Sequence, residues 1–339
     1  MKATALRLST GFGIDALTFD EINVPAPGAG EVLVRIVAVS LNYRDLLVTR
    51  GHYNPKLAFP ATIGSDAAGE VVEVGKGVTA FKEGDRVVAG FMPAWKSGPI
   101  DRTGFDSALG GGELGVMQTH CIFHETALVT VPQSFSLEEA ATLPCAGVTA
   151  WNALVETGNV GPSDTVLLLG TGGVSIFALQ IAKLRGAKTI LTSSSDEKLL
   201  HAKSLGADHT INYRTQPKWD KAVRELTGGQ GATHVVEVGG AGTLPLSLRS
   251  AAFNAQVSLI GVLTGATEPF DVLPVLMHSL CVQGIYVGSV AMLCAIAETF
   301  DQAGIKPVID RTFNFSEAQQ ALRYLESAAH FGKIVLRIS

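Results

Sequence analysis

One short stretch, residues 165–175, constrains the fold of this chain more than any other. Residues 165–169 form an apolar run with the length of a buried strand. Residues 174–184 have the apolar content and spacing of a helix. Gly170, Gly172 and Gly173 lie between them and permit a tight turn. A strand joined to a helix by so short a turn is typical of a parallel α/β sheet.

Strands and helices alternate through the following hundred residues. Their apolar runs lack the in-out alternation of an exposed sheet, which suits strands that are buried on both faces. The predicted elements are strand 189–192, helix 197–205, strand 209–211, helix 218–226 and strands 234–238, 256–260 and 281–287. We therefore expect a doubly wound parallel sheet, the Rossmann arrangement.

The first third of the chain has a different pattern. Short strands are predicted at 31–39, 70–74 and 86–89, and glycine turns separate them. Such a pattern indicates a small rolled-up β domain. A capping box at 136–139 marks the change to helical periodicity. A final strand at 333–338 follows a helix at 316–328, and we expect it to return to the first domain.

Composition excludes several classes of protein. The chain has 339 residues, of which 47% are hydrophobic and 17% charged, as in globular proteins. A net charge of −5 without basic runs argues against a nucleic-acid partner. Two uncharged stretches, 165–182 and 272–297, are broken by glycine or proline, so no membrane role is expected.

The cysteines and the first residues bear on localisation. The four cysteines are scattered without a Cys-x-x-Cys pair, which fits reduced thiols better than a disulfide framework. Residues 1–11 have no apolar region typical of a signal peptide. We expect a cytoplasmic protein.

The glycine turn has the features of a dinucleotide site. Gly170 permits the turn, and Gly172 allows a pyrophosphate to approach the backbone. The amides of Gly173 and Val174 would open the helix, where unpaired N–H groups and the positive end of the dipole attract phosphate. Ser175, the third position of the pattern, is small enough for close strand–helix packing.

The end of the second strand bears on which nucleotide binds. An acidic residue there would hold the ribose 2′-hydroxyl of NAD. The sequence has Ser193 and Ser194 instead, with Lys198 close by, which favours NADPH while NAD remains the alternative. Asp196 and Glu197 are interpreted as the cap and first turn of the next helix.

Ordered sequence blocks across essentially the whole chain resemble the medium-chain dehydrogenase/reductase superfamily, above all its zinc-independent quinone oxidoreductase branch. The blocks are Pro25–Gly28 with Glu31-Val32, Asn42–Asp45, Pro60–Gly69, Gly84–Val87, Leu143–Ala150, the Gly170 turn and Gly332–Val335. The resemblance implies an α/β protein with a GroES-like β-rich catalytic domain, 1–146 and 289–339, and a Rossmann domain, 147–288. Members of the superfamily are usually dimers or tetramers, and by this analogy we expect a homodimer.

The resemblance further implies that no zinc is bound. Zinc members carry a Cys and a His where this chain has Asn42 and Ser65, and a Glu where it has Asp66. Only Cys145 remains of the catalytic ligands, and residues 90–112 lack the cysteines of a structural zinc. The alternative for Cys145 is a small buried apolar residue.

Several cofactor contacts are implied in the same way. Lys198 and Tyr213 match residues that bind the 2′-phosphate, and Val238 and Val262 match strand ends beside the nicotinamide half. The remaining matches are Tyr286 and Val287, within the segment 285–287 that holds the carboxamide, and Lys333, near the pyrophosphate. Tyr213 has the alternative of a surface aromatic residue, and Lys333 that of a solvated strand residue.

Metal-free hydride transfer favours an acceptor that is itself reactive, namely a quinone or an α,β-unsaturated carbonyl. Asn42 and Tyr43, and less so Tyr53, are the candidate donors to its oxygen, although Tyr43 is equally well a wall residue. Asp45 is expected to pair with Arg50 or Arg44 and to shape the wall. Two other functions remain open: an NADP-linked alcohol dehydrogenase with a loosely bound metal, and an NADPH-binding protein without catalysis.

Overall fold

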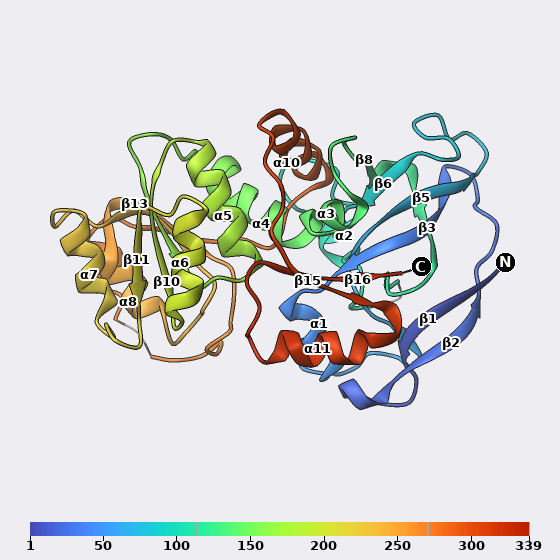
Figure 1. The fold of residues 1–339 in the computed structure, drawn as a ribbon, viewed down its shortest axis with the longest axis horizontal. Helices are drawn as coiled ribbons and strands as arrows, with labels where there is room; N and C mark the ends of the chain where they lie inside the picture. Colours follow the sequence, from blue (N-terminus) through green and yellow to red (C-terminus); the bar gives the residue numbers. More distant parts are fainter. Residues whose placement is uncertain (113, 270, 339) are drawn as a thin grey trace. The chain divides into compact units, whose positions relative to one another are not determined.

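The computed structural model describes residues 1–112, 114–269 and 271–338. The chain divides into two compact units (Figure 1). Unit 1 consists of Met1–Val148 with Val287–Ser339, and unit 2 of Thr149–Tyr286. The domain boundaries expected from the sequence, after residues 146 and 288, lie two residues from these.

Unit 2 contains a six-stranded sheet in the order β11-β10-β9-β12-β13-β14, and every pairing in it is parallel. The strands are β9 (Thr165–Leu169), β10 (Lys188–Ser193), β11 (His209–Asn212), β12 (Ala232–Glu237), β13 (Ala251–Leu259) and β14 (Cys281–Gly284). The helices are α5 (Gly173–Leu184), α6 (Asp196–Ser204), α7 (Trp219–Leu226), α8 (Leu244–Ser250) and α9 (Leu273–Met277). The predicted Rossmann fold is confirmed.

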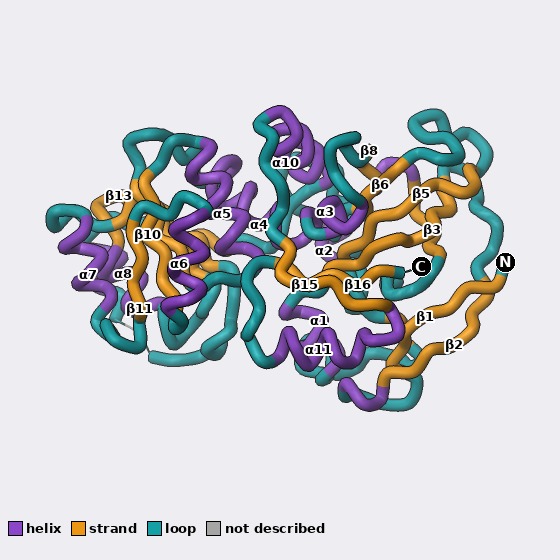
Figure 2. The backbone as a smooth tube through the Cα atoms, viewed as in Figure 1, coloured by secondary structure: helices purple, strands orange, loops and turns teal. Residues whose placement is uncertain are grey.

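The sheet of unit 2 is covered on both faces. α5 and α6 pack on β9, β10 and β11, whereas α7 and α8 contact each other and α8 packs on β12 and β13. Right-handed crossovers place these two pairs on opposite faces, because the chain reverses its direction across the sheet after β11. Figure 2 shows the strands with helices around them. The central strand β9 is accordingly buried at Val166–Leu169.

Unit 1 is rich in β structure, as expected. One sheet has the order β2-β1-β4, and a seven-stranded sheet has the path β15-β16-β3-β5-β6-β8 with β7 also paired to β3. The strands are β1 (Lys2–Leu8), β2 (Leu17–Asn23), β3 (Glu31–Ser40), β4 (Ala61–Thr62), β5 (Asp66–Val74), β6 (Arg86–Ala89), β7 (His120–His124), β8 (Leu128–Thr130), β15 (Ile309–Asn314) and β16 (Lys333–Arg337).

Short helices connect and cover these strands. They are α1 (Tyr43–Thr49), α2 (Arg102–Asp106), α3 (Leu137–Ala141), α10 (Val290–Gln302) and α11 (Ala318–Glu326), and α4 (Val148–Trp151) lies at the boundary of the units. The predicted capping box is present, because Ser136 Oγ accepts from Glu139 N while the Glu139 carboxylate accepts from Ser136 N. No described helix has both the length and the apolar character needed to cross a membrane.

Three neighbouring strands of the larger sheet bring together residues from distant parts of the sequence. β3 pairs antiparallel with β16, Ser40 opposite Val335, and antiparallel with β5, Ser40 opposite Asp66 (Figure 1). The residues just after β3, at the start of β5 and at the start of β16 therefore meet at one end of the sheet. Asn42, Asp66 and Lys333 occupy these positions.

Candidate active site

The glycine turn after β9 leaves its backbone accessible. Gly170 has a φ of 76°, a conformation that favours glycine, and its N–H donates to Thr192 O at 2.9 Å. A Cβ added at Gly170 or Gly172 would meet nothing within 4 Å. Gly172 is the N-cap of α5 without a side-chain hydrogen bond, and Gly173 and Val174 begin the helix. This arrangement of open backbone and a helix N-terminus fits a diphosphate.

Ser175 attaches the helix to the strand that precedes the turn. Its side chain is 1% exposed, and Oγ donates to Leu169 O at 2.6 Å. A larger residue here would push α5 away from β9. Ser175 therefore has the packing role that the sequence indicated, and it adds a hydrogen bond that fixes the turn.

The residues predicted for the 2′-phosphate gather at the ends of β10 and β11. Tyr213 N donates to Ser193 O at 3.1 Å, and the Tyr213 side chain is 41% exposed. Ser194 and Lys198 lie on either side of Ser195, whose Oγ accepts from Lys198 N at 3.4 Å. The cap of α6 is thus Ser195, one residue before the predicted Asp196, which binds Asn212 Nδ2 instead.

A buried carboxylate that sequence analysis missed organises the end of β12. Glu237 is fully buried, and its Oε1 accepts from Gly239 N at 2.7 Å, from Gly240 N at 3.0 Å and from Thr243 Oγ1 at 2.7 Å. Ser247 Oγ donates to Oε2. The sequence signal was available, since an acidic residue inside an apolar strand needs buried partners.

Two predicted nicotinamide contacts, Val238 and Val262, lie in loops next to this carboxylate network. Val238 follows Glu237 directly and is half-buried. Val262 lies in the loop after β13 and is 45% exposed. Thr264, two residues further on, donates through its backbone N–H to Gly239 O at 2.7 Å. The two loops that carry Val238 and Val262 are therefore joined.

The predicted carboxamide segment is less regular than expected. β14 ends at Gly284, so Tyr286 and Val287 lie beyond the strand. Val287 has a φ of 56°, which β-branched residues rarely adopt because of steric strain. Such strain is characteristic of functional segments. The contacts of Tyr286 and Val287 with a cofactor stay predictions.

Unit 1 contains a buried polar cluster around Lys333. Lys333 is 3% exposed, so the alternative of a solvated strand residue is wrong. Its Nζ donates to Leu41 O at 2.5 Å and to Asn42 Oδ1 at 2.6 Å, and Asn42 is 8% exposed. These contacts give Lys333 a role that the sequence did not predict. The pyrophosphate contact remains a prediction.

Asp66 completes the cluster. Oδ1 accepts from Ser65 Oγ at 2.8 Å, and Oδ2 accepts from Cys145 N at 3.0 Å. Burial raises the pKa of Asp66, and the charge of Lys333 opposes this rise. Cys145 lies half-buried in a π-helical turn, Leu143–Gly147, and desolvation raises the pKa of its thiol, with the charge of Asp66 adding to the effect.

Of the two predicted partners of Asp45, Arg50 is wrong, whereas Arg44 acts on the Asp45 carboxyl through its charge. Asp45 Oδ2 accepts from Asn42 N at 2.8 Å and closes the first turn of α1, whereas the Arg50 guanidinium pairs with Glu326. Arg44 Nη1 donates to Leu109 O, and Arg44 lowers the pKa of Asp45 only through its charge. Desolvation, the largest effect, raises that pKa to about 6.

The two tyrosines proposed as donors have different surroundings. Tyr43, the first residue of α1, is 38% exposed. The Tyr53 ring lies under the Arg44 guanidinium, 4.3 Å from its centre. Because cation and ring pack together, Tyr53 is held as part of the wall. Tyr43 remains the more accessible hydroxyl of the two.

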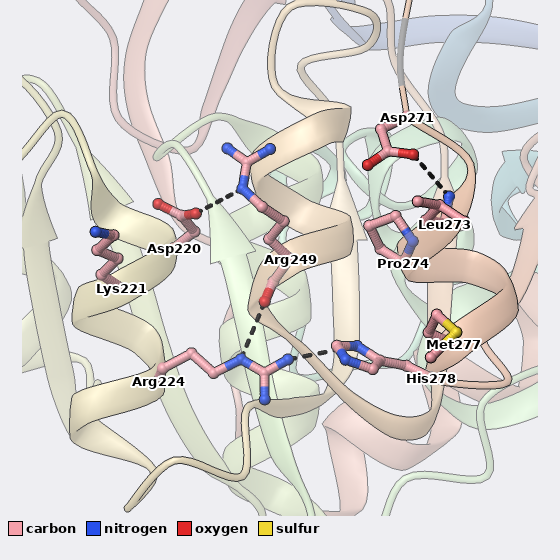
Figure 3. A pocket seen from close by; sticks show the side chains of 9 residues that line it. All are labelled: Asp220, Lys221, Arg224, Arg249, Asp271, Leu273, Pro274, Met277 and His278. Atoms are coloured by element: carbon pink, nitrogen blue, oxygen red, sulfur yellow. Dashed lines mark hydrogen bonds and ion pairs between the residues drawn. The ribbon is translucent and has the colours of Figure 1, made fainter.

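The hollow drawn in Figure 3 does not belong to these sites. It has a volume of about 390 Å³ and lies among α7, α8 and α9. Arg249 Nε pairs with Asp220 at 2.8 Å, and Arg224 Nε donates to Arg249 O at 3.0 Å. Both arginines of the pocket are therefore already engaged, and none of its nine lining residues belongs to the glycine turn or the Lys333 cluster.

The fold and these two groups of residues define a class: an oxidoreductase with a GroES-like unit and a pyridine-nucleotide-binding Rossmann unit. Residues 28–133 match the family described as "Alcohol dehydrogenase GroES-like domain", and residues 173–303 match "Zinc-binding dehydrogenase". The chain belongs to the medium-chain dehydrogenase/reductase superfamily.

Individual relatives agree with this assignment. The zinc-type alcohol dehydrogenase-like protein C1773.06c of Schizosaccharomyces pombe is 44% identical over 96% of each chain. The 2-haloacrylate reductase of a Burkholderia species is 30% identical, again over 96% of each chain. A crystal structure of an NAD-dependent alcohol dehydrogenase is 35% identical, with a TM-score of 0.91 over 99% of this chain and 100% of the other.

Proposed function

We propose that this protein is a zinc-independent, NADPH-dependent oxidoreductase that transfers a hydride to a quinone or an α,β-unsaturated carbonyl. The observation that carries this proposal is the buried contact between Lys333 Nζ and Asn42 Oδ1. It puts an ammonium group among the residues that match the zinc ligands of other superfamily members.

The residues in this cluster do not fit a catalytic zinc. Within the described residues, no three His, Cys, Asp or Glu side chains gather closely enough to hold a metal ion. The Asn42 oxygen and the Asp66 carboxylate already accept hydrogen bonds. Desolvation keeps the Cys145 thiol protonated by raising its pKa, whereas zinc binds thiolate. A divalent cation would also be repelled by the Lys333 ammonium.

The glycine turn and the ends of β10 and β11 support NADPH. The open backbone at Gly170 and Gly172 suits the diphosphate. Ser193 ends β10 and Ser194 follows it, so neither position has a carboxylate that would repel a 2′-phosphate, and Lys198 supplies a positive charge nearby. When bound, NADPH supplies the hydride. Glu237 holds the loop at Gly239 and Gly240 that carries the adjoining residue Val238.

The class of hydride acceptor follows from a set of side chains that does not fit a catalytic zinc, which would otherwise act as the Lewis acid. A hydride added to a conjugated carbon leaves its charge spread over the conjugated system, so a single hydrogen-bond donor suffices to stabilise the oxygen. An alcohol substrate would need a metal or a strong base to form the alkoxide. One of the relatives is named for the reduction of a 2-haloacrylate, in which the double bond is likewise conjugated.

The two alternatives differ from this proposal in measurable ways. A metal-dependent alcohol dehydrogenase would lose activity on chelation and regain it with zinc. A non-catalytic NADPH-binding protein would bind the nucleotide without oxidising it. The test is steady-state NADPH oxidation with 9,10-phenanthrenequinone, 1,4-benzoquinone and 2-cyclohexen-1-one, before and after 1,10-phenanthroline, alongside metal analysis. Turnover that survives chelation in a zinc-free preparation is expected.

We further propose that the protein is a cytoplasmic homodimer. β14 is the last strand of its sheet, and all four of its residues are exposed. Next to it in sequence, α9 exposes Leu273, Leu276 and Met277 at 55%, 73% and 67%. Pairing of β14 with its copy would cover both features in a symmetric interface. The four free cysteines fit a reducing compartment.

A further inference from the structure

The Lys333–Asn42 contact fixes the orientation of the Asn42 side-chain amide. An ammonium group has three donors and no acceptor, so the atom of Asn42 that faces Lys333 Nζ at 2.6 Å must be the amide oxygen. The amide orientation is ambiguous for many asparagines, but here the partner decides it. The nitrogen, Nδ2, is consequently directed away from the ammonium.

Asn42 Nδ2 carries two N–H donors. It is buried and has no hydrogen-bond partner among the described residues. Hydrogen bonding from the Asn42 amide lowers the pKa of the nearby Asp66 carboxyl, although the two groups do not form a close hydrogen bond. Each Asp66 oxygen accepts one hydrogen bond in this structure, Oδ1 from Ser65 Oγ and Oδ2 from Cys145 N. A buried donor without an acceptor is unfavourable, so it calls for an explanation such as a catalytic role or a bound ligand.

The ammonium also strengthens the unused donor. A positive charge on the oxygen side of an amide draws electron density from its nitrogen, and hydrogen bonds in a chain polarise one another. A second hydrogen bond, to Leu41 O at 2.5 Å, and burial at the start of β16 hold the Lys333 ammonium in place. The Asn42 N–H is therefore a rigid and polarised donor.

We propose that Lys333 is a positioning residue, which holds the Asn42 amide so that Nδ2 donates a hydrogen bond to the carbonyl oxygen of the substrate. This inference rests on the proposed function. Hydride adds to the β-carbon of the enone, and the electron pair of the carbon–carbon double bond shifts toward the carbonyl oxygen. The Asn42 N–H stabilises the resulting enolate oxygen. A proton from water then adds to the α-carbon, which gives the saturated ketone and NADP⁺.

The kinetic test uses 2-cyclohexen-1-one and four variants. Asn42→Leu removes the donor in a side chain of similar shape and should lower kcat about 100-fold. Lys333→Met should lower kcat roughly tenfold by releasing the amide, and Lys333→Arg should restore most of the loss. The double variant should be no slower than Asn42→Leu alone, because both substitutions act on the same hydrogen bond from the Asn42 amide.

Two further measurements separate this role from a structural one. NADPH affinity, followed by fluorescence, should stay within about twofold of the wild type in Asn42→Leu, while a fall confined to the Lys333 variants would assign Lys333 to the predicted pyrophosphate contact and overturn the inference. Asn152→Leu serves as the matched control, since Asn152 is also 8% exposed, and its kcat should be unchanged. If Lys333→Met lowers only the melting temperature, or if the two losses multiply in the double variant, the inference is overturned.

A binding experiment reads the same hydrogen bond without turnover. Cyclohexanone should bind the NADP⁺ complex about tenfold more weakly in Asn42→Leu than in the wild type by calorimetry. Equal affinities, or no binding by the wild type, would overturn the inference. Binding that depends on Asn42 in a protein that reduces no enone or quinone would instead reject the proposed function alone. Should Lys333→Met fail to fold, Asn42→Leu and Lys333→Arg still decide the outcome.

Discussion

The backbone N–H of Asn42 donates to Oδ2 of Asp45 at 2.8 Å, and this bond closes the first turn of α1 with a carboxylate that is fully buried. Desolvation raises the pKa of Asp45 from 3.8 to about 6. Below pH 3.8 the folded and unfolded chains both hold the proton, so Asp45 has no effect on the pH dependence of stability. As the pH rises to 6, only the unfolded chain releases its proton, and stability is lost; above pH 6 the loss is complete.

Asp45→Asn is therefore expected to stabilise the protein at neutral pH. The asparagine oxygen can still accept from Asn42 N, and it carries no charge to desolvate. A difference of two pKa units corresponds to about 3 kcal/mol, which is an upper limit for the gain above pH 6. Urea unfolding of both proteins between pH 4 and pH 8 measures it. A stability difference that does not grow with pH would contradict the assignment.

Gly172→Ala is expected to abolish tight NADPH binding without disturbing the fold. The added Cβ meets no protein atom within 4 Å, and the φ of Gly172, −78°, is accessible to alanine. The methyl group would instead occupy space that a diphosphate needs, and we expect affinity to fall by at least roughly tenfold. Gly11→Ala, also without neighbours within 4 Å, is the control. Unchanged NADPH affinity would show that the phosphates lie elsewhere.

Ser194→Asp is expected to shift the nucleotide preference toward NADH. A carboxylate at the end of the second strand repels a 2′-phosphate and accepts a hydrogen bond from a ribose hydroxyl. The ratio of NADPH to NADH affinity should fall by roughly tenfold or more, measured by nucleotide fluorescence. Ser204→Asp adds the same charge at the other end of α6. If both variants change the ratio equally, the effect is one of net charge.

Glu237→Gln and Glu237→Leu should differ sharply. Glutamine can accept from Gly239 N, Gly240 N and Thr243 Oγ1 with its oxygen, while its amide donates to Ser247 Oγ, so we expect a loss below about 1 kcal/mol. Leucine leaves buried donors without an acceptor and should cost about 1–3 kcal/mol for each. Chemical unfolding measures both losses. Equal losses in the two variants would mean that the carboxylate charge, and not its acceptor capacity, stabilises the loop.

Charge on α9 should weaken the proposed dimer. Leu276→Glu and Met277→Lys each add a charge to a side chain that is at least two-thirds exposed, so the isolated fold should tolerate them. A homodimer would bury these positions, and a desolvated charge there weakens association. Light scattering after size exclusion should show a shift toward the monomer. Leu200→Glu on α6, 67% exposed, is the control.

Local regularities made much of unit 2 predictable. β9 has the predicted bounds, and α5 begins one residue before the predicted start, because an apolar run, a glycine turn and a helical period all act within a few residues. β14 is shorter than predicted. The apolar run continues to Val287, but β14 ends at Gly284, and the backbone adopts a positive φ at Val287. No pattern of residue types reveals that bend.

The sequence alone determined the βα turn at Gly170 and the two serines at the end of β10, since both depend on residue identity at close spacing. Only the tertiary structure brought Lys333 to Asn42, which is 291 positions away in the chain. That contact exists because β16 pairs with β3 and β3 with β5, and long-range strand pairing is decided by the burial of the whole sheet. The same packing buries Lys333, which as a strand residue could have been solvated, and brings its ammonium group to the buried Asn42 amide.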